Sequence, residues 1–214
     1  MTALSIGLDP GKRSDPASLA VVEFQFVARD GPRDQQGERW IVRDARQWPL
    51  GTPHPVVVED SGAVADQTGG YLVFDQTGVG ETYHDLFNLA RKQKRLASRT
   101  RGVLITSGQM PSDIGIPKEV LVRRFEAKLS SGRVVVAESC SLKEVLRQQL
   151  ERFGYEFTKR GATTYEALKD ADHDDLPLAV MLATYFKKYQ PGDPRYLARD
   201  GQLYPYRSLS HDPY

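Results

Sequence analysis

The chain alternates short apolar runs with longer segments of helical spacing. The apolar runs are rich in Val, Ile, Leu and Phe and are bounded by turn residues, a pattern typical of buried strands. They predict strands over residues 4–9, 19–27, 39–44, 71–74, 103–106 and 133–136. Other segments repeat apolar positions every three or four residues, and they predict helices over residues 56–67, 81–93, 116–129 and 141–153, with a long apolar helix within 172–189.

Local signals mark where several of these helices begin. Pro55 and Pro117 suit a first helical turn, because proline has no N–H to leave unsatisfied there. Ser141, with Glu144 three residues later, is predicted to cap the helix that follows it. Pro177 must also lie in a first turn, so the last helix is expected to begin between residues 173 and 176.

The order of these elements predicts an α/β fold. A polar link over residues 29–37 joins the second and third strands as a hairpin, so the first three strands are expected to be antiparallel neighbours. The later strands alternate with helices, which favours a central mixed sheet with helices on both faces. This domain is expected to span residues 1–190. Residues 191–214 hold four Pro and four Tyr without periodicity, and they are expected to form an extended C-terminal tail.

Composition narrows the class of protein. A chain of 214 residues fits one large domain or two small ones, and its single cysteine, Cys140, excludes an internal disulfide framework and a Cys-rich zinc site. No apolar run reaches the length of a membrane span, and the N-terminus lacks the features of a signal peptide. The protein is therefore expected to be soluble and cytoplasmic. A net charge of +1 excludes a strongly basic nucleic-acid binder but allows a local basic patch.

Acidic residues at the ends of apolar elements are the most informative feature of the sequence. Asp9 ends the first strand, and Asp75 ends the run YLVFD. Asp174 and Asp175 open the long apolar helix. Carboxylates held at strand ends suit hard divalent cations such as Mg²⁺ or Mn²⁺. Three converging carboxylates can hold two ions about 3.5–4 Å apart, which clamps the attacking and leaving oxygens of a phosphodiester.

Each acid alone also has a structural explanation. An Asp before Pro-Gly is common in turns, and an Asp at a helix start is a good N-cap. Three such coincidences together favour a shared site. Asp174 and Asp175 lie about 100° apart on a helix, so only one of them points squarely at that site. Asp174 is favoured, and Asp175 is expected to support it.

Two groups of cations are candidates for contact with a phosphate backbone. Residues 91–101 hold six Lys or Arg and no acid, although such a run is also typical of a solvated helix end. Its members are Arg91, Lys92, Lys94, Arg95, Arg99 and Arg101. Arg123, Arg124 and Lys128 form a second group, for which a surface role without specific contacts is the stronger interpretation. The loop over residues 76–80 is a weak phosphate-binding signal, and its glycines are expected to let the chain turn away from Asp75.

These residues also carry a resemblance to a known family. The segments GLDPGKRSDPASLAVVE, LVFDQTGVGETYHDLF and DADHDDLPLAVMLA resemble the three signature segments of the nuclease domain of phage terminase large subunits. The connecting pieces WPLGTPHPVVVED, TSGQ, IPKEVL and TYEAL are similar to the same family, so the resemblance covers residues 6–186. DQTGVG and HDDLPLA are its specific parts, whereas GLDPG also occurs in Holliday-junction resolvases.

The resemblance implies an RNase H-like fold and a site for two divalent metal ions, Mg²⁺ or Mn²⁺. Enzymes of that family cut double-stranded DNA during genome packaging. By position the catalytic, metal-binding acids would be Asp9, Asp75 and Asp174, with Asp175 as an additional metal ligand.

Two further residues take a role from the resemblance. Lys118 follows a proline, as in the family, and would neutralise charge near the cleaved phosphate, although a first-turn Lys in solvent fits the sequence equally well. His173 stands beside the acid pair, and because Mg²⁺ favours oxygen ligands it would lie outside the immediate ligand set.

The sequence contains no G-x-x-x-x-G-K-[ST] loop, so the chain is not expected to hydrolyse ATP. The partners that the resemblance implies are double-stranded DNA, a packaging ATPase domain or subunit, the portal and the small terminase subunit, in the host cytoplasm if the protein is viral. Low sequence specificity is expected, because no recognition-helix signature is present. Two other functions remain open: a structure-selective resolvase, motivated by GLDPG, and a non-catalytic RNase H-like scaffold of the packaging motor.

Overall fold

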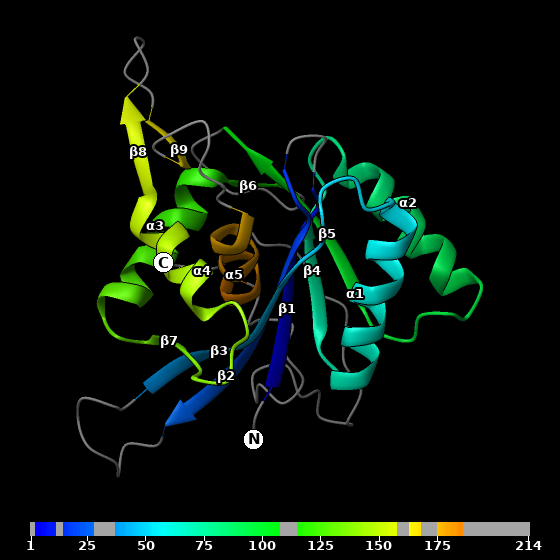
Figure 1. Ribbon diagram of the computed structural model, residues 1–214, viewed down its shortest axis with the longest axis horizontal. Helices are drawn as coiled ribbons and strands as arrows, with labels where there is room; N and C mark the ends of the chain where they lie inside the picture. The colour runs from blue at the N-terminus through cyan, green and yellow to red at the C-terminus, as the bar shows by residue number, and fades with distance from the viewer. Residues whose placement is uncertain are drawn as a thin grey trace, which may run out of the picture.

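A central sheet of seven strands organises the protein, which is described by a computed structural model over residues 3–11, 15–27, 37–107, 115–157, 163–167 and 175–185 (Figure 1). The strands are β1 (Ala3–Asp9), β2 (Ser18–Val27), β3 (Gly37–Gln47), β4 (Tyr71–Asp75), β5 (Thr100–Thr106), β6 (Gly115–Pro117) and β7 (Val134–Val136). Their order across the sheet is β6-β5-β4-β1-β2-β3-β7.

The sheet is mixed, as the sequence predicts. β1, β2 and β3 are antiparallel neighbours, whereas β4 pairs in parallel with β1, β5 with β4, β6 with β5 and β7 with β3. A register shift between Val21 and Val22 bends the long β2–β3 ribbon. The predicted fold class is therefore confirmed, including the three antiparallel strands that open it.

Helices cover both faces of this sheet. They are α1 (His54–Thr68), α2 (Gly80–Lys92), α3 (Lys118–Ser130), α4 (Lys143–Arg152) and α5 (Asp175–Tyr185). One apolar cluster joins α3, α4 and α5 to one face, and a second cluster joins α1 and α2 to the other. α1 starts close to its predicted position, with Pro55 in its first turn. It ends at Thr68 and is capped by Gly69, whose φ of 63° is in the left-handed region that favours glycine.

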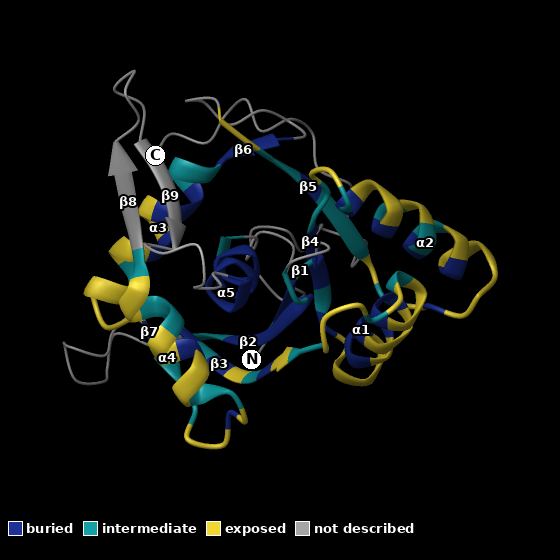
Figure 2. Cartoon of the chain, turned by 45° about the horizontal axis from the view of Figure 1, so that its top comes forward, coloured by how far each residue is buried: buried dark blue, intermediate teal, exposed yellow. Residues whose placement is uncertain are grey.

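α5 is the central helix of the first cluster. Every one of its residues from 175 to 184 is buried, and Figure 2 shows the helix dark around its whole circumference, unlike α1 and α2. Its closest approach to the sheet is at Gly7 of β1, where an added Cβ would lie 1.8 Å from the carbonyl oxygen of Ala179 and 2.8 Å from the nitrogen of Ala183. A side chain at position 7 would therefore push α5 off the sheet.

Two predicted helix starts are wrong in detail. Residues 115–117 form the short edge strand β6 against β5, so the helix expected from residue 116 begins at Lys118, with Pro117 just before it. Ser141 does not cap α4, which begins at Lys143. Its hydroxyl instead donates to the carbonyl oxygen of Ala45, 3.1 Å away, which ties the loop before α4 to the end of β3.

The structure adds an element that the sequence patterns did not predict. β8 (Phe153–Phe157) and β9 (Thr163–Ala167) form a separate antiparallel pair, so the helix expected to reach residue 153 ends at Arg152. The predicted tail over residues 191–214 lies outside the described residues, as does the proposed domain boundary at residue 190. None of the helices in the described ranges is long and apolar enough to cross a membrane.

Candidate metal centre

Asp9 and Asp75 end two neighbouring parallel strands. β1 and β4 pair with Leu8 opposite Phe74, and each acid directly follows its member of that pair. Neighbouring strands lie about 4.8 Å apart, which brings both carboxylates within reach of one site. The structure thus brings together the first two acids that the sequence singled out.

Both acids belong to the face of the sheet that α5 covers. Side chains alternate along a strand, so Asp9 shares a face with Gly7 and Asp75 shares a face with Val73. Gly7 lies against the α5 backbone, and Val73 belongs to the apolar cluster that contains α5. The two carboxylates therefore stand at the edge of the sheet on the side from which α5 approaches.

The C-terminal end of α5 lies near the other end of the strands, away from the two acids. The Lys128 ammonium donates to the carbonyl oxygen of Thr184, 2.7 Å away, and lies 4.6 Å from the centre of the Trp40 ring. Trp40 pairs with Phe24 of β2, and Phe24 pairs with Ala3 at the start of β1. The end of α5 is therefore level with the start of β1.

The head of α5 consequently lies toward the edge that carries the two acids. Its first residue, Asp175, is only 5% exposed. The next N–H, of Leu176, donates to Oε1 of Gln149 on α4, 3.2 Å away. The positive end of a helix favours a nearby carboxylate, so this end suits the acid pair at residues 174 and 175.

The third carboxylate of the predicted site is Asp174, which lies outside the described residues together with His173. Within the ranges that the structure describes, no three Asp, Glu, His or Cys side chains are grouped so that they could hold a metal. Asp175 therefore does not complete a three-ligand set with Asp9 and Asp75.

The loop after β4 holds Asp75 in place. The Thr77 N–H donates to Oδ1 of Asp75, 2.7 Å away, and the Thr77 hydroxyl accepts the N–H of Ile105 on β5 at 2.8 Å. Gly80 lets α2 begin this close to the strand, because an added Cβ would lie 2.0 Å from the Asp75 carbonyl oxygen. The glycines of this loop thus serve the strand-to-helix turn, as expected.

Tyr83 on α2 is coupled to the acid edge. The residue is 1% exposed, and its pKa is raised to about 12, first by burial and then by the negative charge of Asp9. Its ring lies 5.1 Å from that of His54 at the start of α1. Sequence patterns identified neither residue as part of the site, because Tyr83 occupies an ordinary core position of an amphipathic helix.

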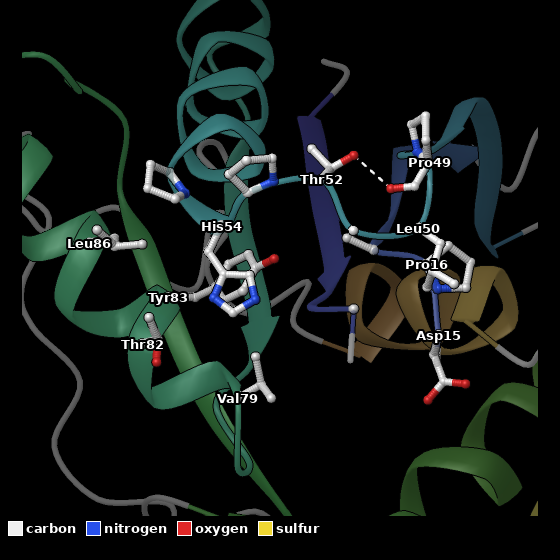
Figure 3. Close-up of a pocket in the computed structure, with 15 residues that line it drawn as sticks. Asp15, Pro16, Pro49, Leu50, Thr52, His54, Val79, Thr82, Tyr83 and Leu86 are labelled. Atoms are coloured by element: carbon white, nitrogen blue, oxygen red, sulfur yellow. Dashed lines mark hydrogen bonds between the residues drawn. The ribbon is translucent and has the colours of Figure 1, made fainter. Parts of the chain in front are cut away.

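A cavity of about 620 Å³ opens beside this edge (Figure 3). Three segments line it: the turn after β1, the connection from β3 to α1, and the first turns of α2. His54 and Thr82 lie on one side and Asp15 on the other, between apolar walls that include Leu50 and Val79. Gly11, two residues after Asp9, and Tyr83 line the cavity, whereas Asp9 and Asp75 themselves do not.

Lys118 lies on the side of the sheet where the parallel strands have their carboxyl ends, as do the two acids. It follows Pro117, which pairs with Thr106 at the carboxyl end of β5. The sheet order β6-β5-β4 puts it two strands from Asp75.

The basic run over residues 91–101 lies mostly away from the acids, although its last member, Arg101, pairs with Val73, two positions before Asp75. It begins at the end of α2, a helix of 13 residues that extends about 20 Å from its start beside Asp75. The carbonyl of Arg99 accepts the N–H of Leu72 near the start of β4, which places this segment at the opposite edge of the sheet. Arg95 forms an ion pair with Glu59 of α1, so one cation of the run is already partly neutralised.

The second basic group divides into surface and buried members. Arg123 is exposed and pairs with Glu119 one turn earlier. Arg124 lies 5.0 Å from the centre of the Tyr185 ring, and Lys128 is directed into the protein against α5. Lys128 is therefore not a candidate for contact with a phosphate backbone.

The chain is similar in structure to nuclease domains of phage large terminases. The large terminase nuclease from thermophilic phage G20c matches with a TM-score of 0.62 and 19% identity, over 85% of this chain and 81% of that chain. The same nuclease with bound magnesium matches at 0.61 and 20%, over 85% and 80%. The large terminase nuclease domain of Thermus phage P74-26 matches at 0.57 and 18%, over 95% and 84%.

No family model matches the sequence, and no curated protein matches it. The structural similarity covers most of the chain, and the seven-stranded mixed sheet with flanking helices is the fold that is shared. The chain therefore shares the RNase H-like fold of these nuclease domains.

Proposed function

We propose that this protein is a metal-dependent DNA endonuclease of the viral genome-packaging type. The observation that carries the proposal is the position of Asp9 and Asp75, each directly after the Leu8–Phe74 pair at the carboxyl ends of adjacent parallel strands, on the face covered by α5. The shared fold with large terminase nucleases, one of them solved with bound magnesium, supports the same activity.

The residues at this edge fit hard divalent cations, Mg²⁺ or Mn²⁺. Their donors are carboxylate oxygens, and the ordered turn from Asp75 to Thr77 fixes the orientation of one carboxylate before any ion arrives. Asp9 and Asp75 would hold the ions together with Asp174, and Asp175 would support them from the head of α5. Two bound ions would supply a metal-bound nucleophile and stabilise the charge on the cleaved phosphodiester.

Other residues of the chain take roles around this centre. Lys118 lies at the same edge and would neutralise charge on a DNA phosphate, and His173 would contact the site from outside the ligand set. The six cations of residues 91–101 would grip the DNA backbone: those that follow the end of α2 would do so about 20 Å from the cleaved bond, and Arg101, opposite Val73 on β5, would do so nearer to it.

A role in genome packaging also implies specific partners. The chain would act on double-stranded DNA with low sequence specificity, alongside a packaging ATPase domain or subunit, the portal and the small terminase subunit, in the host cytoplasm.

Supercoiled plasmid provides the test. We expect nicking and linearisation with Mg²⁺ or Mn²⁺ and no cleavage with EDTA. Cleavage that persists in chelator, after removal of contaminating nuclease, would exclude the metal-dependent mechanism. A parallel assay on four-way junction DNA separates the resolvase, because strong preference for the junction over linear duplex would replace the packaging assignment.

A further inference from the structure

The N-terminal end of α5 contributes to the candidate site through Asp175. The side chains of the helix, however, offer few directional contacts that could fix its position along the sheet. Every residue from 175 to 184 is buried, and apart from Asp175 and Thr184 the side chains in that stretch are apolar. Apolar contacts are non-directional, so they resist removal of the helix from the core better than they resist rotation or a small axial shift. Directional contacts must therefore define where Asp175 lies along the sheet.

The structure has one such contact at the far end of the helix. The Lys128 ammonium donates to the Thr184 carbonyl oxygen at 2.7 Å, in the last described turn of α5. The same ammonium lies 4.6 Å from the centre of the Trp40 ring of β3. One buried cation thus joins α3, α5 and the sheet.

A neighbouring contact on α3 acts on the same turn. Arg124, one helical turn before Lys128, stacks 5.0 Å from the centre of the Tyr185 ring, the last described residue of α5. α3 therefore holds the end of α5 with two cations spaced i and i+4, which share one face of a helix.

The other end of the helix is held from α4. The Leu176 N–H donates to Gln149 Oε1, 3.2 Å away. With Lys128 at one end and Gln149 at the other, the axial position of α5 has two directional supports, at Leu176 and Thr184, eight positions apart. The Lys128 hydrogen bond is the shorter of the two, at 2.7 Å against 3.2 Å, so Lys128 is the principal support.

We propose that Lys128 is a positioning residue for the metal centre: by holding the C-terminal turn of α5 against Trp40, it sets the axial position at which the head of α5 presents its acids to Asp9 and Asp75. The inference rests on the proposed function, because it assigns a purpose to the position of those acids. It adds that a residue at the opposite edge of the sheet controls the affinity of the site for metal.

The test compares Lys128→Met with Lys143→Met. Methionine keeps most of the aliphatic stem and removes the charge and the donor. Lys143 is the matched lysine because it is also partly buried, but its ammonium donates to Glu138 rather than to α5. Binding of Mn²⁺ alone is measured by calorimetry, and amide hydrogen exchange across α5 is measured without metal.

We expect Lys128→Met to weaken Mn²⁺ binding at least tenfold and to speed exchange in α5 relative to the rest of the core. We expect Lys143→Met to remain within about twofold of wild type in both measurements. Lys128→Arg, which keeps the charge and the donor, should recover most of the affinity. Wild-type Mn²⁺ affinity and exchange in Lys128→Met, or an Arg variant as weak as the Met variant, would overturn the proposal.

The test also allows for a variant that does not fold and for a wild-type protein that binds no Mn²⁺. If Lys128→Met does not fold, Lys128→Gln carries the same test, because its amide is one bond shorter and should still lose affinity; wild-type affinity in that variant overturns the proposal. If wild-type protein binds no Mn²⁺, the proposed function fails. The positioning role is then judged on exchange alone, where unchanged α5 protection in Lys128→Met overturns it and selective loss supports it.

Discussion

Asp9 and Tyr83 are electrostatically coupled across the edge of the sheet, because the Asp9 carboxylate adds to burial in raising the pKa of the Tyr83 phenol to about 12. Asp9→Asn should therefore lower the pKa of Tyr83, although burial should keep it above the ordinary value of 10. Alkaline absorbance titration of both proteins measures the difference. Asp15→Asn, on the other side of the cavity, is the control, and an unchanged Tyr83 titration in Asp9→Asn would contradict the coupling.

Asp75→Asn should abolish DNA cleavage and leave the fold intact. Asparagine keeps the side-chain oxygen that accepts the Thr77 N–H, so the turn survives, but a hard cation loses a charged ligand. Relief of repulsion between neighbouring carboxylates should raise the melting temperature of the metal-free protein.

The measurements are plasmid cleavage and thermal melting, each with and without Mn²⁺, beside Asp85→Asn, which removes an exposed carboxylate from α2. A variant that keeps more than about a tenth of the wild-type rate, a loss under roughly 1.4 kcal/mol of barrier, would remove Asp75 from the site. A variant that fails to fold would assign Asp75 to the turn alone.

Neutral substitutions at Lys92, Lys94 and Arg99 should weaken DNA binding equally for all sequences. Because these residues lie at the opposite edge from the acids, the substitutions should raise KM and leave kcat unchanged. Each lost phosphate contact should reduce the slope of log K against log salt by roughly 0.9. Arg147→Gln is the control, since Glu144 and Glu151 already pair with that exposed cation. An unchanged slope would identify the run as a solvated surface.

Lys128 should make stability depend on pH. Burial, and after it the charge of Arg124, lower the pKa of Lys128 to about 7 from its ordinary value of 10.5. Between these values the unfolded chain binds more protons than the folded protein, so the free energy of unfolding should rise with pH, by up to about 1.4 kcal/mol per pH unit. The contribution is absent below pH 7 and complete above 10.5.

Urea unfolding of wild type and Lys128→Met from pH 6 to pH 10 isolates this effect, since the other titrating groups are common to both proteins. The difference between the two stabilities should grow in favour of wild type through that range. Parallel curves would contradict the lowered pKa.

The sheet could be predicted because its strands are short apolar runs that end in turn residues. Asp9 and Asp75 were recognised for the same reason, since a carboxylate directly after an apolar strand is an evident feature of a sequence. The strand register that makes them neighbours is a long-range relationship, and only the structure provides it.

The errors arose where tertiary contacts outweigh local signals. Ser141 stands where the sequence predicts a helix cap, but its hydroxyl donates a hydrogen bond to the carbonyl oxygen of Ala45 instead. The sequence predicts the start of a helix at residue 116, yet residues 115–117 form the edge strand β6, which pairs with β5. Lys128 looked like a surface cation, and nothing local distinguishes it from Arg124. Its burial depends on Thr184, which is 56 positions away.

The packing of α5 against β1 also governs when the site can form. Gly7 and Ala179 are in contact across the first and last described elements of the fold, and Asp175 follows Asp9 by 166 positions, the difference of their numbers. At synthesis rates of roughly 5–20 residues per second, the early strands wait on the order of ten seconds or more for this helix. Until it docks, the apolar face of β1 and β2 has no cover and the acids of β1 and β4 have no third partner. On the proposed function, a ribosome-bound chain therefore carries an incomplete nuclease, and cutting activity begins only after almost the whole domain has left the ribosome.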